Sequence, residues 1–337
     1  MGQRKRVNFY TRLLSISSAF IAVLLAFQLF TYSAPPDPNA TAENNSTTKE
    51  AGAYAIYSLD IPEQMNFAGE TVPVDRYDIK ESFDRELLVN TYWQSQTILF
   101  LKRANRYFPV IEPILKEHGV PDDFKYLSLI ESSFMPRAKS PAGAVGLWQF
   151  MKATGKEYGL EITKEVDERY HIEKATVAAC KYLKKMHDHY DSWTLAAAAY
   201  NAGRTGVNRQ LSRQKTGSYY DLLLGEETGR YVFRILAIKE ILSNPDHYGF
   251  HVKNEDLYHP VKTVDLNIKK GIPDFADFAI QYGTTYKELK NLNPWLREPF
   301  LTNSGKKTYT LKLPESARNL VEPIKTVKKD STEINKG

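Results

Sequence analysis

The sequence predicts a mainly α-helical domain that is followed by a small module of mixed helices and strands. Apolar residues recur every three or four positions across residues 107–118, 172–190 and 231–242, which is the spacing of one helix face. Few alternating, strand-like segments occur in this region. After Pro260, two alternating segments flank two short helical ones. The 337 residues, 42% of them hydrophobic, suffice for one or two domains with substantial cores.

Three apolar stripes define the longer helices that we expect. Asp191 or Ser192 can cap a further helix, which would end at Gly203. The members of the stripes are Tyr107, Ile111, Ile114, Leu115 and His118; Ile172, Ala175, Ala179, Tyr182, Leu183, Met186 and Tyr190; and Tyr231, Ile235, Ile238 and Leu242.

A short helix is expected after residues 121–123, because Phe124, Leu127 and Glu131 are spaced three and four apart. Glu131 would lie near its C-terminal end, and Pro136 should stop the helix. A carboxyl group against apolar surface, with no cation nearby, has a raised pKa and can stay protonated near neutral pH. Such a group can donate a proton to a leaving oxygen. The alternative is a solvated surface glutamate.

Three motifs occur in order along the chain. Residues 131–151 read Glu-Ser-Ser-Phe-Met-Pro-Arg-Ala-Lys-Ser-Pro-Ala-Gly-Ala-Val-Gly-Leu-Trp-Gln-Phe-Met, residues 198–203 read Ala-Ala-Tyr-Asn-Ala-Gly, and Tyr231-Val232 opens the third apolar stripe. Together they resemble the soluble lytic transglycosylase family of the goose-lysozyme-like superfamily, and more narrowly its membrane-bound transglycosylase D branch. The resemblance covers roughly residues 80–250. It implies a lysozyme-like helical catalytic domain.

The resemblance implies a role for Glu131 as the catalytic acid and base. It would protonate the oxygen that links N-acetylmuramic acid to N-acetylglucosamine in peptidoglycan. It would then take the proton of the muramyl 6-hydroxyl, which closes onto C1 to leave a 1,6-anhydro end. Hydrolytic glycosidases normally use two carboxylates. No Asp or Glu lies between Glu131 and Glu157, although a distant carboxylate could fold into the cleft. A hydrolytic muramidase and a non-catalytic wall-binding protein are therefore the alternatives.

The resemblance also implies which residues bind the substrate. Hydroxyl and amide groups at Ser140 and Gln149 can hydrogen-bond sugar substituents, and Met151 can pack against a sugar ring. Tyr200 and Asn201 match residues that hold the oxocarbenium-like sugar and its acetamido group, and Tyr231 matches a phenol that points at the catalytic carboxyl. Gly143 and Gly146 are expected to let the backbone approach the glycan. The predicted substrate-binding residues are Ser140, Gly146, Gln149, Met151, Ala199, Tyr200, Asn201 and Tyr231.

The N-terminus reads as a secretory signal or an uncleaved anchor over residues 1–34. Four cationic residues precede an apolar run from Leu13 to Phe30. Cleavage after Ala34 would place Pro35 first in the mature chain, which favours the anchor. Residues 35–76 are expected to be a linker, polar and flexible in its first part. The single Cys180 allows neither an intramolecular disulfide nor an N-terminal lipid linkage.

One loop departs from the resemblance. Residues 167–172 read Asp-Glu-Arg-Tyr-His-Ile, where the branch tends to read Asp-Glu-Arg-Arg-Asp-Pro, so a different cleft shape is expected there. His187 and His189 could suggest a metal site, but side chains two apart on a helix point to different faces. We predict no metal and no cofactor.

The segment after the catalytic domain (77–257) resembles a degenerate LysM module over residues 258–315. The expected order is a strand at 261–266, helices at 275–282 and 286–292, and a strand at 307–313. Gly271-Ile272-Pro273 replaces the usual Gly-Asp-Thr turn, so this module either binds N-acetylglucosamine-containing glycan or serves packing alone. Residues 316–337 are expected to be a disordered tail.

Composition and net charge limit the classes of partner that the chain is expected to bind. The formal net charge of +5 is small, and no basic stripe or reader motif for nucleic acid occurs. The 21 Tyr, 16 Phe and 4 Trp suit a sugar-binding cleft as well as a packed core. The predicted partner is peptidoglycan glycan, residues 13–30 are the candidate inner-membrane anchor, and the predicted location is the cell envelope, on the periplasmic side.

Overall fold

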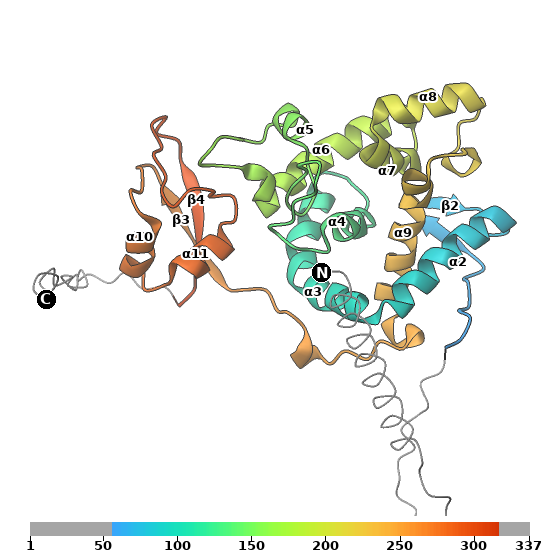
Figure 1. The fold of residues 1–337 in the computed structure, drawn as a ribbon, viewed down its shortest axis with the longest axis horizontal. Coiled ribbons are helices and arrows are strands. Elements are labelled where there is room, and N and C mark those ends of the chain that lie inside the picture. The colour runs from blue at the N-terminus through green and yellow to red at the C-terminus, as the bar shows by residue number, and fades with distance from the viewer. Residues whose placement is uncertain (1–55, 317–337) are drawn as a thin grey trace, which may run out of the picture. The chain divides into compact units, whose positions relative to one another are not determined.

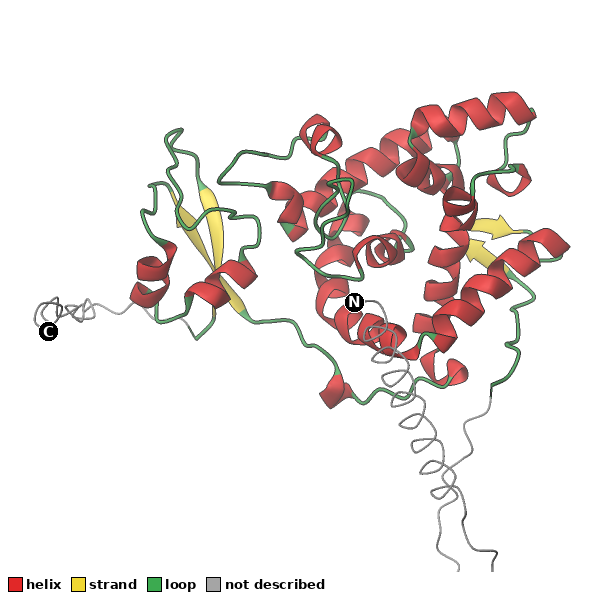
Figure 2. Ribbon diagram, in the orientation of Figure 1, coloured by secondary structure: helices red, strands yellow, loops and turns green. Residues whose placement is uncertain are grey.

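The computed structural model describes residues 56–316 and confirms a mainly helical domain followed by a small α+β module (Figures 1 and 2). The elements of the first domain are β1 (Met65–Phe67), β2 (Glu70–Val72), α2 (Tyr77–Tyr92), α3 (Gln94–Glu117), α4 (Phe124–Ser132), α5 (Lys152–Glu157), η1 (Glu168–Tyr170), α6 (Ile172–Tyr190), α7 (Trp193–Ala202), α8 (Arg204–Gln214), η2 (Tyr219–Asp221), α9 (Glu226–Ser243), η3 (Pro245–Tyr248) and η4 (Asn254–Asp256). The module contains β3 (Thr263–Ile268), α10 (Phe275–Gln281), α11 (Tyr286–Leu292) and β4 (Tyr309–Pro314).

The short helix α4 lies inside the helical domain, where it contacts α3 and α9 (Figure 1). Its Phe124, Leu127 and Leu129 are completely buried, which explains why a nine-residue helix is stable here although it would be marginal alone. Ser133, with a φ of 53°, ends the helix in the left-handed conformation, three residues before Pro136. The packing of α4 therefore fixes where Glu131 lies.

The prediction of a linker over residues 35–76 is wrong in its second half. β1 and β2 form an antiparallel hairpin, and its Phe67 and Val72 are buried in the core. The Glu70 carboxylate accepts hydrogen bonds from the backbone N–H groups of Trp193 and Thr194, so it caps the first turn of α7. Strands of three residues are too short to show an alternating pattern, so they could not be predicted from periodicity.

The module has the predicted order of strand, two helices and strand. β3 and β4 pair antiparallel from Thr263 opposite Pro314 to Ile268 opposite Tyr309. Phe275 and Leu289 of the two helices and Leu311 of β4 are completely buried. This hydrophobic cluster also includes three residues of the helical domain, which are Val145, Val166 and Tyr170. The module and the helical domain thus share a core.

A backbone connection reinforces that shared core. Val166 forms an antiparallel bridge with Leu296, and the N–H groups of Asp167 and Arg297 donate to carbonyls of the opposite segment. Tyr170 and His171, which depart from the expected Arg-Asp pattern, also contact the module: the Arg297 guanidinium lies over the Tyr170 ring at 4.0 Å, and the His171 ring stacks on Trp295.

The predicted signal or anchor, the first part of the linker and the tail beyond residue 316 lie outside the described residues. Within residues 56–316, no helix combines the length and the apolar character that crossing a bilayer requires.

Candidate active site

Glu131 is partly buried near the C-terminal end of α4, as predicted. The phenol of Tyr231, on α9, donates a hydrogen bond to its Oε1 atom. No Lys, Arg or His among residues 56–316 forms an ion pair with this carboxylate. The arrangement supplies one neutral donor and no ion pair.

The environment raises the pKa of Glu131 to about 7, first of all because burial disfavours the ionised form. The hydrogen bond from Tyr231 acts in the opposite direction, and the negative charge of Glu227 adds to the increase. Arg234 contributes a smaller, opposing effect. Near neutral pH the group can therefore both hold and release a proton, which general acid and base catalysis requires.

The motif loop, residues 138–151, is held by contacts with four elements that surround it. The Trp148 indole N–H donates to Thr176 Oγ1 at 2.9 Å, and the Tyr200 phenol donates to the Trp148 carbonyl at 2.7 Å. Ser128, on α4, donates to the Leu147 carbonyl at 3.3 Å. The most extensive contact comes from Arg169, whose guanidinium donates to the carbonyls of Gly143 and Phe150 while it pairs with Asp167.

Gly146 has a structural role that the sequence did not predict. Its φ is 78°, and a Cβ atom there would lie 2.0 Å from the Arg169 carbonyl oxygen. The absence of a side chain therefore allows the close approach of η1, and an approach of the glycan stays a prediction. Gly143 also has a positive φ, 89°, but has open space around its Cα, so it serves the turn between Ser140 and Ala144.

Two other predicted residues are committed to protein contacts. Ala199 is 0% exposed, so its side chain cannot contact a substrate, and its carbonyl accepts from the Tyr182 phenol. Tyr231 is likewise buried, and its phenol contacts the Glu131 carboxyl rather than solvent. The side chains of both residues are therefore in contact with the protein.

The remaining predicted residues keep some access to solvent. Met151 is 44% exposed at the start of α5. The Ser140 hydroxyl accepts from the Ala144 N–H at 3.0 Å, and the Gln149 amide donates to the Gly146 carbonyl at 2.7 Å. Gln149 also has a φ of 46°, which is uncommon for a residue with a side chain.

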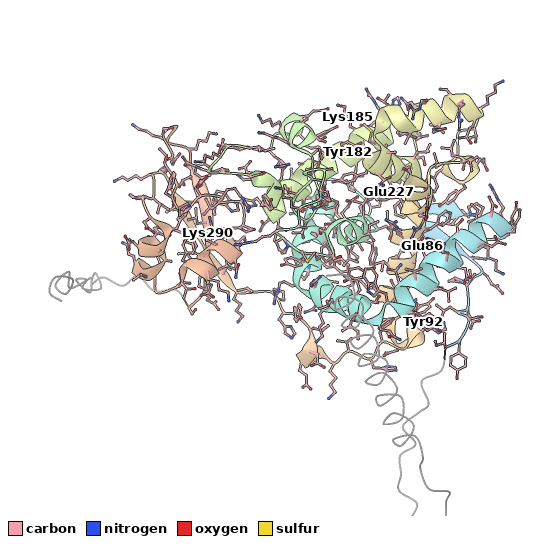
Figure 3. All side chains as sticks on the ribbon, in the orientation of Figure 1. Glu86, Tyr92, Tyr182, Lys185, Glu227 and Lys290 are labelled. Atoms are coloured by element: carbon pink, nitrogen blue, oxygen red, sulfur yellow. The ribbon has the colours of Figure 1, made fainter. Side chains whose placement is uncertain are left out.

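Glu227, at the start of α9, is the site residue that sequence reasoning missed (Figure 3). It is exposed, and the Asn201 amide donates to it at 3.5 Å. Asn201 in turn accepts from the Thr228 hydroxyl at 2.8 Å. Glu227 follows Glu131 by 96 positions, so only the fold brings the two carboxylates near each other. The predicted helix opened at Tyr231, whereas α9 begins at Glu226. Acidic residues are typical of the first turn of a helix, so Glu226 and Glu227 were the signal that could have revealed the earlier start.

The histidine pair has other contacts. The His187 ring stacks on Trp193 with a centroid distance of 4.0 Å, whereas His189 meets Asn208 at 3.3 Å. No group of three potential metal ligands occurs within the described part of the chain.

Comparisons with known proteins assign both parts of the chain to domain families. Residues 108–223 match the transglycosylase SLT domain, and residues 264–317 match the soluble lytic transglycosylase C-terminal LysM-like domain. The chain is 31% identical over 232 residues to membrane-bound lytic murein transglycosylase D of Escherichia coli strain K12, which covers 67% of this chain and 50% of the relative. The chain therefore spans about half of that relative's length.

Two further similarities were found. The peptidoglycan transglycosylase gp16 of Escherichia phage T7 is 37% identical over 120 residues, which cover 35% of this chain and 9% of the phage protein. The crystal structure of the 70 kDa soluble lytic transglycosylase of Escherichia coli aligns with a TM-score of 0.38 and 18% identity, over 54% of this chain and 32% of that one.

Proposed function

We propose that this chain, which carries a transglycosylase SLT domain and a LysM-like domain, is a lytic transglycosylase that cleaves the bond between N-acetylmuramic acid and N-acetylglucosamine in peptidoglycan. The observation that carries the proposal is the partly buried Glu131, whose pKa is raised to about 7 and which, within residues 56–316, accepts a hydrogen bond from Tyr231 and forms no ion pair. The motif matches and the name of the relative support the substrate.

The proposed reaction has two steps. In the first, the Glu131 carboxyl gives its proton to the glycosidic oxygen, and the bond from that oxygen to C1 of the muramyl residue breaks. In the second, the Glu131 carboxylate takes the proton of the muramyl 6-hydroxyl while O6 bonds to C1. The enzyme returns to its starting protonation state, no water is consumed, and the product has a 1,6-anhydro end.

Tyr231 suits this cycle because its phenol can donate to the carboxylate that forms between the two steps. Its own pKa is raised well above the usual value by burial and by the neighbouring Glu131 charge, so it remains a donor throughout. The motif loop, held by Arg169 and Tyr200, would present Ser140, Gln149 and Met151 to the sugars. Tyr200 thus acts in this account through the loop, while Asn201 lies beside Glu227.

A hydrolytic muramidase is the second candidate, and Glu227 is the observation that favours it. Two carboxylates in one site could act as an acid and a base that activates water. Glu227 is exposed and its charge raises the pKa of Glu131, as a second carboxylate in one cleft would. Its hydrogen bond to Asn201 gives it an equally good use as an anchor for that amide.

Product mass distinguishes the two candidates. Purified protein is incubated with isolated sacculi in water enriched in oxygen-18, and the soluble fragments are weighed by mass spectrometry. A lytic transglycosylase gives fragments that are lighter by one water and free of the heavy isotope. Reducing ends that carry oxygen-18 would contradict the proposal and would assign the base to Glu227, a result that the Glu227→Gln variant should then abolish.

The wider role is proposed on the same basis. Cleavage of this bond would serve turnover and remodelling of the cell wall, with the active site on the periplasmic side of the inner membrane. The relative's printed name describes a membrane-bound protein, and the apolar residues 13–30 are the proposed anchor of this chain.

A further inference from the structure

A cavity of about 580 Å³ lies between the helical domain and the LysM-like module. Its walls come from α3, from residues 134–137, from residues 258–263 and from α11 and β4 of the module. Residues 134–137 follow Glu131 closely, and the Arg103 guanidinium donates to the Ser133 carbonyl at 2.9 Å. The chain segment that follows Glu131 therefore forms part of the cavity wall.

Three arginines in this wall, Arg103, Arg106 and Arg137, have no carboxylate partner among residues 56–316. Their hydrogen bonds go to backbone carbonyls, which are those of Ser133, His259 and Lys290. A guanidinium has five N–H donors, so each retains several for a ligand. We call this cavity the arginine pocket.

The two acidic residues of the arginine pocket, Glu173 and Glu288, already have partners. Glu173 is paired with Lys312 at 3.0 Å, and its pKa is lowered to about 2, where burial is outweighed by His171 and Lys312. Glu288 accepts a hydrogen bond from the Thr284 hydroxyl at 2.8 Å. The lining thus contains four cationic side chains, Arg103, Arg106, Arg137 and Lys312, and two carboxylates, so a net positive charge remains in the pocket.

The lining between these charges is mixed apolar and aromatic. Tyr107, Val110, Phe134 and Leu292 contribute to it. Arginine forms strong bidentate hydrogen bonds with carboxylates, and apolar walls accept short aliphatic groups. A carboxylate-bearing peptide has both features, and the peptides of peptidoglycan are joined to the muramyl sugar on which Glu131 is proposed to act.

We propose that the arginine pocket binds a carboxylate of the peptide arm of peptidoglycan, and so couples recognition of the peptide to cleavage of the glycan. This inference rests on the proposed function for the identity of the substrate. The proposed binding site would need both domains. Arg103 and Arg106 come from α3, while Lys312 and Leu292 come from the module.

Binding of the sugar-free alanyl-γ-glutamyl-diaminopimelate peptide to the full chain, measured by calorimetry at low salt, tests the proposal. Combined Arg106→Gln and Arg137→Gln substitutions should weaken binding at least tenfold. Amidation of the peptide carboxylates should weaken it similarly for the unmodified protein. Arg213→Gln, an exposed arginine on α8 outside the pocket, is the matched control and should change nothing. Thermal unfolding verifies that each variant is folded.

Equal affinity for the acidic and the amidated peptide would overturn the proposal, as would an equal loss in the Arg213→Gln control. Vesicles that contain phosphatidylglycerol form a second arm. If the double substitution abolishes vesicle binding while the peptide never binds, the pocket is a site for anionic lipid and the proposal is wrong. Peptide binding needs no turnover, so a chain that binds the peptide but cleaves no glycan contradicts the proposed function alone.

Discussion

Two carboxylates that contact α9, the buried Glu86 and the partly buried Glu131, have opposite environments. Glu86, on α2, is 1% exposed and accepts from Arg85 and Arg230, each at 2.6 Å (Figure 3). Glu131, on α4, has no such cation and contacts Tyr231 instead. Arg230 and Tyr231 are neighbours in sequence, so one turn of α9 presents a charge to one carboxylate and a neutral phenol to the other.

The difference shows how a single helix can serve stability and chemistry together. The Glu86 charge is compensated, so this carboxylate joins α2 to α9. Glu131 lacks compensation and becomes neutral by holding a proton, which it can then donate. Substitution of Glu86 should therefore lower stability, whereas substitution of Glu131 should lower activity.

The largest expected effect is the loss of activity in Glu131→Gln. An amide cannot deliver a proton, and general acid–base catalysis contributes roughly two to four powers of ten, so turnover should fall at least about a hundredfold. Release of soluble muropeptides from sacculi measures it. Glu117→Gln, an exposed glutamate of α3, is the control and should be fully active. If turnover of Glu131→Gln stays within a few-fold of that of the unmodified enzyme, Glu131 is not the catalytic acid.

At Glu86 the effect should be on stability. The Glu86→Gln substitution removes the negative charge that pairs with Arg85 and Arg230. The free energy of unfolding should therefore fall by about 2 to 4 kcal/mol. The arginines are partly exposed, which places the loss near the lower value, about 2 kcal/mol. Urea denaturation measures it. A variant as stable as the unmodified chain, or one inactive while fully folded, would erase the contrast with Glu131.

The raised pKa of Glu131 should also make the stability of the folded chain depend on pH. The pKa of Glu131 is about 7 in the folded chain against 4.5 for an ordinary glutamate, so folding disfavours its ionised form. Stability of the unmodified protein should therefore decline relative to Glu131→Gln as pH rises from about 4.5 to about 7, by at most about 3 kcal/mol. Denaturation midpoints at several pH values test this. A difference that stays constant with pH would mean that the pKa is not raised.

The smallest effect is expected for Tyr231→Phe. Its phenol lowers the pKa of Glu131, so removing it should raise that pKa and shift the alkaline limb of the activity profile to higher pH. Loss of one hydrogen bond should reduce turnover roughly tenfold, or about 1.4 kcal/mol. A profile displaced to lower pH would show that the phenol does not stabilise the carboxylate.

The elements that local pattern determines were predictable. The α4 helix, the cap at Ser192, the stripe of α6 and the order of the module all follow from spacing and turn residues. Glu131 stood out because one acid follows an apolar helix and precedes a loop without carboxylates.

What the sequence could not reveal depends on contacts between distant segments. Glu70 caps a helix that begins 123 positions later, and Glu227 approaches Glu131 across 96 positions. Gly146 was predicted to let the backbone approach the glycan, and only the structure shows the Arg169 carbonyl close to its Cα. Three-dimensional packing decides each of these, and local periodicity contains no trace of it.

The central claim, that Glu131 is a carboxyl group with a pKa near 7, is tested most directly by its own titration. Carbon-13 NMR of the glutamate side-chain carboxyls, followed from about pH 4 to about pH 9, resolves the resonance, and its disappearance in Glu131→Gln assigns it. The structure predicts a midpoint near 7. A midpoint near 4.5, the value of an ordinary glutamate, would contradict the account.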